Sequence, residues 1–249
     1  ELLEIFDVPA SALPTIVPNY GKLAETSALH FLGIKAPITG MAGDQQAALF
    51  GQAGFEVGDN KCTYGTGAFI LQNTGSKRVA STHGLLTTIA WQTPDGTLTY
   101  ALEGSVFVAG SAIQWLRDGL QVIESSPEIN PLAESVEDSG GVVFVPALTG
   151  LGAPQWDPEA RGTIFGLTRG TTKAHLARAT LEALAFQVRG VVDSIVKDAG
   201  QDLRSLRVDG GAAASTAMPR VEAATPARPS CSPRRGCLPN QEALSAPAK

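Results

Sequence analysis

The chain has 249 residues, a formal net charge of −5 and 43% hydrophobic residues, which predicts one or two folded domains rather than a disordered polypeptide. The negative charge disfavours nucleic-acid binding, because neutralising phosphates requires a basic surface. The longest uncharged run, residues 140–156, contains four glycines and two prolines. It is shorter than the about 20 apolar residues of a membrane span, so we expect none.

No secretory signal opens the sequence, and the three cysteines have neither a disulfide framework nor zinc-site spacing. We therefore expect a cytoplasmic location. The sequence begins at Glu1 without a methionine, so we expect that the natural start is missing or was removed by processing.

Two hairpins and a helix are predicted in the first half of the chain. Residues 37–52 indicate a short buried strand, a glycine turn and a helix that begins near Asp44. Residues 61–73 form two β-rich runs around Gly65-Thr66-Gly67, which is typical of a hairpin. A second hairpin is predicted over residues 86–102, with its turn at 93–96.

Helices and strands continue to alternate in the second half. A helix is predicted from Phe107 to Leu120, and the apolar run 141–148 fits a buried strand. A long amphipathic helix begins after a cap at Thr171 or Thr172 and ends at Gly200. A short strand then leads into Gly210-Gly211. The predicted class is α/β.

The last 31 residues, 219–249, differ from the rest of the chain. They hold six of the 16 prolines, and they contain no Phe, Tyr, Trp or Ile. Such a segment cannot bury enough apolar surface to offset the entropy lost on ordering. We expect either a disordered tail or a reading-frame shift near Met218.

Three glycine-bearing turns carry the first chemical signal, at residues 65–67, 109–111 and 210–212. Glycine lets backbone N–H groups approach a phosphate closely, although each turn by itself is also an ordinary structural turn. Asp44 is the second signal. It either stabilises the first turn of its helix through the helix dipole, or acts as a general base or metal partner.

Taken together and in order, these segments resemble the FGGY family of carbohydrate kinases, and within it the enzymes that phosphorylate glycerol. The resemblance extends over about residues 1–218 and is carried by six motif regions, which lie at 43–52, 63–67, 100–118, 149–170, 178–182 and 207–211. Several motifs in the right order are far more specific than any single glycine turn.

The resemblance implies an actin-like, ribonuclease-H-like fold with two domains and a cleft between them. Residues 1–53 would be the end of the first domain, and 54–218 an incomplete second domain. The implied reaction transfers the γ-phosphoryl group of ATP, with Mg²⁺, to glycerol and gives sn-glycerol 3-phosphate. Family members are about twice this length. We therefore expect the chain alone to have little or no activity. We also expect the full-length parent to be a homo-oligomer.

The resemblance also implies roles for individual residues. Asp44 would be the catalytic base, and it would contact glycerol together with Gln45 and Phe69. No residue is assigned as a metal ligand. The implied nucleotide contacts are Thr66, Gly67, Gly110, Gln114, Gly211 and Ser215, of which Ser215 stands where related kinases often have Asn.

Three alternatives stay open at this point. The chain could derive from another FGGY kinase that acts on a pentulose or a similar sugar. It could be a nucleotide-binding fragment without catalysis, in which case it would bind nucleotide but form no product. It could also be a translation product with no role, which the composition of residues 219–249 would fit.

Overall fold

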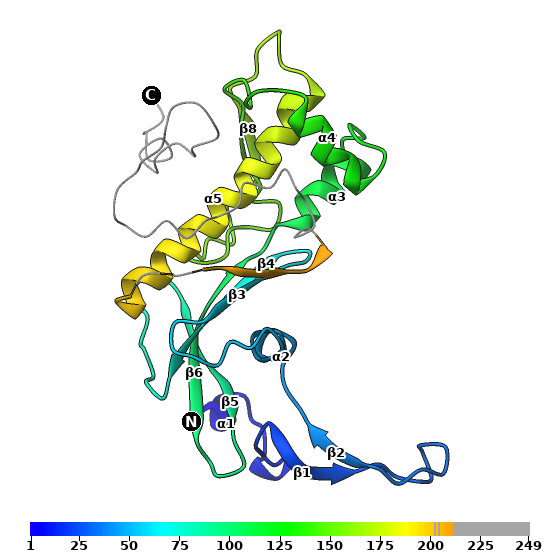
Figure 1. Ribbon diagram of the computed structural model, residues 1–249, viewed down its shortest axis with the longest axis vertical. Coiled ribbons are helices and arrows are strands. Elements are labelled where there is room, and N and C mark those ends of the chain that lie inside the picture. Colours follow the sequence, from blue (N-terminus) through cyan, green and yellow to red (C-terminus); the bar gives the residue numbers. More distant parts are fainter. Residues whose placement is uncertain (202, 204, 212–249) are drawn as a thin grey trace.

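The computed structural model describes residues 1–201, 203 and 205–211 (Figure 1). Residues 219–249 and Ser215 therefore lie outside the described part. The described elements run, in chain order, α1 (Leu2–Ile5), η1 (Ala10–Ala12), β1 (Tyr20–Glu25), β2 (Pro37–Gly40), α2 (Asp44–Gly51), β3 (Asn60–Tyr64), β4 (Ala68–Gly75), β5 (Leu86–Gln92), β6 (Leu98–Val106), α3 (Gly110–Asp118), η2 (Ser126–Glu128), α4 (Ile129–Glu134), β7 (Val143–Val145), β8 (Thr163–Phe165), α5 (Lys173–Ala199) and β9 (Arg207–Asp209).

A five-stranded sheet with the order β5-β6-β4-β3-β9 forms the centre of the molecule. The two predicted hairpins are confirmed: β3 pairs with β4, and β5 with β6, both antiparallel. The last strand, β9, instead pairs with β3 in parallel, so that Thr63 lies opposite Asp209. This pairing brings the end of the described chain back beside β3, which lies in the first third of the sequence.

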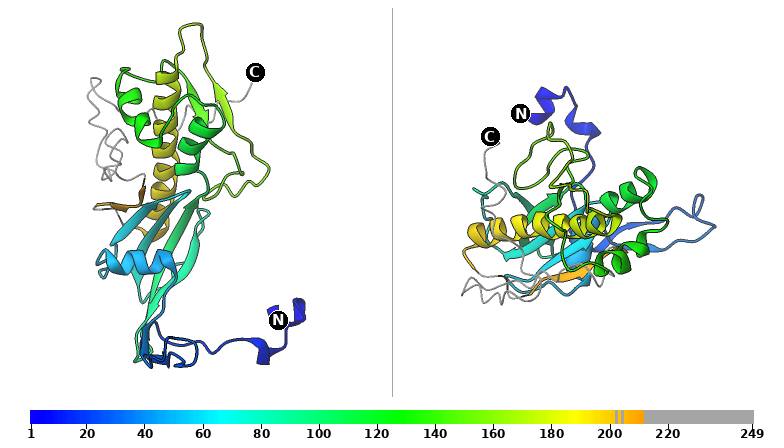
Figure 2. Two further views of the ribbon diagram at one scale, coloured as in Figure 1. Left: turned by 90° about the vertical axis from the view of Figure 1, so that its right-hand side faces the viewer. Right: turned by 90° about the horizontal axis from the view of Figure 1, so that it is seen from above.

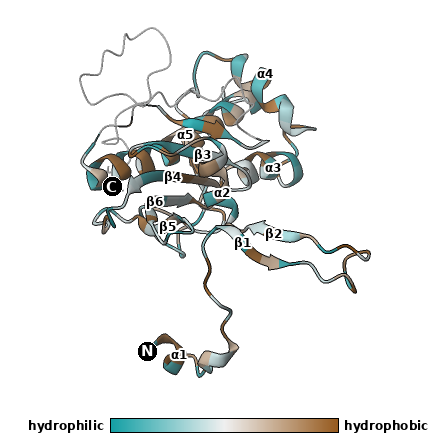
Figure 3. Cartoon of the chain, turned by 60° about the horizontal axis from the view of Figure 1, so that its bottom comes forward, coloured by the Kyte–Doolittle hydropathy of each residue, from teal (hydrophilic) through white to brown (hydrophobic). Residues whose placement is uncertain are grey.

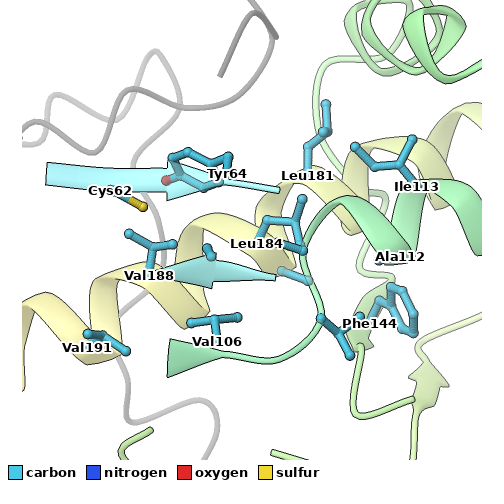
Figure 4. Packing of buried hydrophobic residues seen from close by; sticks show 14 of the residues in the cluster. Cys62, Tyr64, Val106, Ala112, Ile113, Phe144, Leu181, Leu184, Val188 and Val191 are labelled. Atoms are coloured by element: carbon cyan, nitrogen blue, oxygen red, sulfur yellow. The ribbon is translucent and has the colours of Figure 1, made fainter. Parts of the chain in front are cut away.

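Helices cover the two faces of this sheet (Figure 1). Because side chains alternate along a strand, each strand contributes to both layers. Ile70 of β4 packs in the core beneath α5, whereas its neighbour Leu71 packs with Leu49 of α2. The larger core lies on the α5 side, where Leu184 and Val188 meet the strands (Figure 4).

The long helix α5 confirms the strongest helix prediction. Thr172 caps its first turn in a capping box with His175, and Gly200 ends it in the left-handed conformation with φ of 67°. Both features satisfy backbone groups that a helix end leaves unpaired. The apolar stripe that the sequence predicts is buried along the helix.

Two predicted elements are shorter than the sequence pattern suggests. The helix expected from Phe107 begins at Gly110, because residues 107–109 connect β6 to it. The strand expected over 141–148 is limited to Val143–Val145. Gly141 before it has a φ of +80°, and Pro146 after it has no N–H to continue the ladder.

The N-terminal arm, residues 1–43, projects away from the sheet and from α5 (Figure 2). None of the first 48 residues is buried. The strand expected before Asp44 forms as β2, but the prediction that it is buried was wrong. Within the arm, β1 and β2 form a separate two-stranded sheet. Asn19 connects this hairpin to β5, since its backbone N–H donates to the Gln92 carbonyl and its Oδ1 accepts from the Gln92 N–H.

Helix α2 follows the arm, and it packs against β3, β4 and β5. The predicted division at residue 53 would assign α2 and the arm to one domain and the sheet to another. That division stays a prediction.

Candidate functional site

Two of the predicted glycine turns lie against each other at the end of β3. The turn at residues 65–67 connects β3 to β4, and residues 109–111 begin α3. The Gly110 N–H donates to the Gly65 carbonyl over 3.0 Å, and the Ser111 N–H donates to the Thr66 carbonyl over 3.1 Å. The Ser111 hydroxyl also donates to the Thr66 carbonyl. The fold thus places Gly110 beside Thr66 and Gly67, although more than 40 residues of sequence separate them.

The packing of these turns explains why glycine stands at two of their positions. A Cβ at Gly110 would lie 2.5 Å from the Gly65 carbonyl oxygen, and one at Gly67 would lie 2.4 Å from the Val106 carbonyl oxygen. Both distances are far below van der Waals contact, and the obstacle in each case is backbone. The turn at residues 65–67 can approach both α3 and the end of β6 this closely only without side chains at these two positions.

The third glycine turn reaches the same strand end from the other side. Gly210 follows β9 with a φ of +91°, and a Cβ there would lie 2.2 Å from the Tyr64 carbonyl oxygen. Because β9 runs parallel to β3, Gly211 lies beside the end of β3. Three segments that are distant in sequence therefore converge at one end of one strand.

The other predicted nucleotide residue that the structure describes, Gln114, is exposed on α3. It lies four residues after Gly110, so both residues share one face of the helix. The sequence places Gln114 within reach of the same region for this reason. Ser215 lies outside the described residues.

Asp44 is the first residue of α2, and its carboxylate is exposed. The backbone N–H of Gln45 donates to Asp44 Oδ1 over 2.9 Å, and the Gln45 side-chain amide donates to Oδ2 over 3.2 Å. The negative carboxylate is also placed at the positive end of the helix dipole. Asp44 and Gln45 therefore form one unit at the start of α2.

Lys61 is a component of this region that the sequence analysis missed. Its side chain extends from β3 toward α2 and is fully buried. Its ammonium donates to Gln45 Oε1, to Thr63 Oγ1 over 3.0 Å, and to the Phe69 carbonyl over 3.3 Å. Phe69 lies opposite Thr63 in the β3–β4 ladder, so its side chain shares the sheet face of Lys61. Lys61 thus joins the two predicted substrate residues Gln45 and Phe69.

One signal in the sequence could have identified Lys61. In the strand Lys61-Cys62-Thr63-Tyr64, the side chains of Cys62 and Tyr64 point to one face and those of Lys61 and Thr63 to the other. A lysine at a central position of a strand covered on both faces requires partners, because a buried ammonium is costly without them. The sequence does not reveal which partners these are.

Acidic groups surround Lys61. Burial lowers the pKa of Lys61, while the charges of Asp209, Cys62, Glu103 and Asp44 oppose this shift. Burial raises the pKa of Glu103, and the nearby Lys61 ammonium counteracts it. The site therefore contains a buried cation among carboxylates.

The two ends of α2 are held by different strands. Lys61 of β3 contacts Gln45 at the start of the helix, and the Gln52 side-chain amide donates to Asp209 Oδ2 of β9 at its end. Asp209 directly precedes the Gly210-Gly211 turn. Helix α2 is thus connected both to the predicted glycerol residues and to a predicted nucleotide turn.

A cavity of about 450 Å³ lies on the other side of α2, between the helix, β5 and the β1–β2 hairpin. Gln46, Phe50, Met41 and Trp91 contribute to its walls. Asp44, Gln45, Phe69 and the glycine turns do not line it. Its position therefore gives no support to the predicted catalytic residues.

Within the residues that the structure describes, no three or more His, Cys, Asp or Glu side chains gather as a metal site would require. His83 instead contacts Asp198, and His175 caps α5. In the described part of the chain, no helix has both the length and the apolar character needed to cross a bilayer.

Known proteins match this chain closely. Residues 60–229 match the C-terminal domain of the FGGY family of carbohydrate kinases. The chain is 62% identical over 212 residues to a glycerol kinase of Oceanobacillus iheyensis. The aligned segment covers 85% of this chain and 42% of that protein. It is 56% identical over 223 residues to a glycerol kinase of Bdellovibrio bacteriovorus, covering 90% of the chain and 45% of that protein.

Solved structures agree with these sequence matches. A Plasmodium falciparum glycerol kinase with ADP superposes with a TM-score of 0.78 at 42% identity, and the match covers 87% of this chain and 44% of the kinase. A xyloylose kinase from Brucella ovis superposes with a TM-score of 0.72 at 22% identity, which shows the fold alone. The predicted actin-like fold is confirmed.

The chain spans less than half of the length of these relatives, 42% and 45% of the two bacterial kinases. The resemblance inferred from the ordered motifs is nevertheless confirmed by the match over residues 60–229 and by identities above 50%. The chain belongs to the FGGY family of carbohydrate kinases.

Proposed function

We propose that this chain is part of a kinase that transfers the γ-phosphoryl group of ATP to glycerol. The observation that carries the proposal is the convergence of three glycine turns at the end of β3 in a chain that is 56–62% identical to glycerol kinases. The xyloylose kinase from Brucella ovis is only 22% identical, so identity favours glycerol over a pentulose.

In this proposal the glycine turns bind the nucleotide. Backbone N–H groups of turns without side chains can come close to phosphate oxygens. The proposed nucleotide contacts are Thr66, Gly67, Gly110, Gln114, Gly211 and, beyond the described residues, Ser215. Mg²⁺, when bound with ATP, would supply positive charge that neutralises the phosphates during transfer.

Asp44 is the proposed base for the glycerol hydroxyl, with Gln45 and Phe69 as further glycerol contacts. A carboxylate with an ordinary pKa near 3.9 is a weak base toward an alcohol. It suffices when the proton leaves late, in a loose phosphoryl-transfer transition state that requires mainly alignment and charge neutralisation. The exposed carboxylate of Asp44 at the start of α2 is accessible for this role.

A second candidate is a nucleotide-binding fragment without catalysis. The observation that favours it is that the predicted nucleotide turns converge within the described residues, whereas the cavity beside α2 is lined by none of the predicted glycerol residues. A cytoplasmic location and an oligomeric parent belong to the first proposal. The buried free thiol of Cys62 is compatible with a reducing compartment.

Three measurements test the proposal. Calorimetry with the purified chain should detect ADP binding, and a glycerol phosphorylation assay of the chain alone should show little turnover. Residues 1–211 should then be grafted into a full-length relative in place of its matching segment. We expect this graft to phosphorylate glycerol in preference to D-xylulose.

The outcomes separate the two candidates. ADP binding together with an inactive graft would support the non-catalytic fragment. Preference of the graft for D-xylulose would assign a pentulose kinase. Failure of the folded chain to bind ADP would contradict both.

A further inference from the structure

We propose that Lys61 is a positioning residue, which holds the Gln45 amide and, through it, the Asp44 carboxylate in the orientation needed to receive glycerol. This inference rests on the proposed function, which assigns glycerol to Gln45 and Asp44. Lys61 itself is fully buried and therefore acts through its neighbours rather than on a ligand.

The three contacts of Lys61 come from three different elements. Its ammonium has three N–H donors and meets three acceptors, namely Gln45 Oε1 of α2, Thr63 Oγ1 of β3 and the Phe69 carbonyl of β4. The donor count matches the acceptor count only for the protonated lysine, because a neutral amine has two donors. The ammonium thus joins the start of α2 to the β3–β4 hairpin.

Lys61 also determines which way the Gln45 amide faces. An ammonium can only donate, so the amide oxygen of Gln45 must point toward it and the NH₂ group must point away. In this orientation the NH₂ group donates to Asp44 Oδ2 over 3.2 Å. The second N–H of the same NH₂ group remains as the donor that Gln45 can offer to a polyol hydroxyl.

Without Lys61, one contact alone holds this orientation. Among the described residues, the other side-chain hydrogen bond of Gln45 runs to the exposed carboxylate of its neighbour Asp44, over 3.2 Å. The amide oxygen would then have no donor on the sheet, and a single exposed contact between adjacent side chains is a weak anchor. We therefore expect both Gln45 and Asp44 to lose their alignment.

Lys61→Met tests the inference, because methionine keeps most of the side-chain volume and removes the three donors. The measurement is NMR of the full chain with ¹⁵N-labelled glutamine, in which the Gln45 side-chain signals are assigned by their loss in Gln45→Ala. We expect these signals to shift toward values of a free glutamine in Lys61→Met. We also expect glycerol affinity to fall about tenfold, as for a lost hydrogen bond to a charged group, with ADP affinity within about twofold.

Thr63→Val is the matched control. It removes another acceptor of the same ammonium but leaves the Gln45 contact in place. We expect a loss of stability with unchanged Gln45 signals and with glycerol affinity within about twofold of the wild-type value. If both variants weaken glycerol binding equally, Lys61 has only a structural role and the inference is overturned.

Two further outcomes distinguish a failure of the variant to fold from a failure of the proposed substrate. If Lys61→Met does not fold, NMR of the wild-type chain tests the inference instead. A nuclear Overhauser contact between Lys61 and the Gln45 amide would support it. Gln45 signals like those of a free glutamine would overturn it. If the wild-type chain binds no glycerol while its Gln45 signals depend on Lys61, the proposed substrate fails but the positioning of Gln45 stands.

Discussion

At Gly110, the start of α3 comes into close contact with the glycine turn at residues 65–67. The Gly110 Cα faces the carbonyl of Gly65, and an added Cβ would lie 2.5 Å from that oxygen. The obstacle is backbone, so it cannot move aside as a flexible side chain would. The turn at residues 65–67 would have to separate from α3 to accommodate even one methyl group.

We therefore predict that Gly110→Ala weakens ADP binding about tenfold or more, and lowers the free energy of unfolding by about 1–3 kcal/mol through overpacking. Calorimetry with ADP and urea unfolding measure the two effects. Gly190→Ala is the control, since beyond the backbone of α5 itself and the two adjacent residues nothing lies within 4 Å of its added Cβ. It should stabilise the chain by up to about 1 kcal/mol, because alanine is the better helix former. Normal ADP affinity in Gly110→Ala would contradict the assignment of this turn.

Asp44 gives the second prediction at the scale of single residues. In the grafted full-length kinase, Asp44→Asn should lower turnover about 10²–10⁴-fold, because the amide has no basic oxygen to take the hydroxyl proton. ADP affinity should not change. Asp95→Asn, which alters an exposed carboxylate in the β5–β6 turn, should leave turnover within about twofold. A turnover of Asp44→Asn within tenfold of the parent would refute its role as base.

Sequence motifs identify individual site residues more readily than they identify partners. Asp44, Thr66 and Gly110 stand in motifs that a family resemblance can assign. Lys61 was missed because its role depends on α2 packing over β3, and spacing in the sequence does not report this tertiary contact. The same limit applies to Asp209, whose carboxylate accepts from Gln52 across 157 residues of separation.

At the scale of elements, the loop before β5 is attached to the end of α5 by one carboxylate. The Asp198 side chain is 1% exposed, and it accepts hydrogen bonds from the Ser81 hydroxyl and from the backbone and hydroxyl of Thr82. Nδ1 of His83 lies 2.6 Å from Asp198 Oδ1. Burial raises the pKa of Asp198, but the hydrogen bonds from His83, Ser81 and Thr82 outweigh it and lower this pKa to about 2.

A lowered folded-state pKa stabilises the fold when the carboxylate is ionised. The stabilisation by Asp198 should therefore be complete above about pH 5 and be lost as the pH falls toward 2. We predict that Asp198→Asn costs about 1–3 kcal/mol in unfolding free energy at pH 7, and that it reduces the loss of stability between about pH 4 and pH 2.

Urea unfolding at pH 7 and at pH 3 measures this effect. Asp193→Asn is the control on the same helix, where a partly exposed carboxylate pairs with Arg189 one turn away. It should cost about 0.5 kcal/mol or less at pH 7. Equal losses in both variants would show that Asp198 does not hold the loop more strongly than an ordinary surface pair.

Elements with strong local signals were predicted well. The capped helix α5 and the two hairpins carry their own start, stop and turn residues, so local sequence specifies them. The prediction for residues 141–148 was too long because apolar runs show burial but not length. Pro146 within that run was the signal that should have shortened it.

At the scale of the whole molecule, the site depends on topology that local patterns do not contain. The parallel pairing of β9 with β3 brings Gly211 to the turn at residues 65–67. A strand of three residues, Arg207–Asp209, carries too little pattern to reveal its partner. Family resemblance supplied this part of the prediction, and the structural match at a TM-score of 0.78 confirms the fold that it implied.

The N-terminal arm gives the last prediction, because it exposes apolar side chains without contributing to either core. Large hydrophobic residues such as Phe6, Ile16 and Leu32 are exposed along it (Figure 3). Asn19 and Gln92 form the hydrogen bonds that tie the arm to the sheet. A chain that starts at Met41 should therefore lose only about 1–2 kcal/mol of unfolding free energy, as expected for a few edge hydrogen bonds.

A chain that starts at Asn60 provides the contrast, since it also lacks α2. Leu49 of α2 is fully buried against Leu71 and Trp91, and its loss alone should cost about 2–5 kcal/mol. Urea unfolding followed by circular dichroism would compare the three chains, and binding of a hydrophobic dye would report their exposed apolar surface. We expect the chain from Met41 to unfold cooperatively and to bind less dye than the full chain. If it instead unfolds like the chain from Asn60, the arm supports the sheet in solution and α2 is not the boundary of the stable unit.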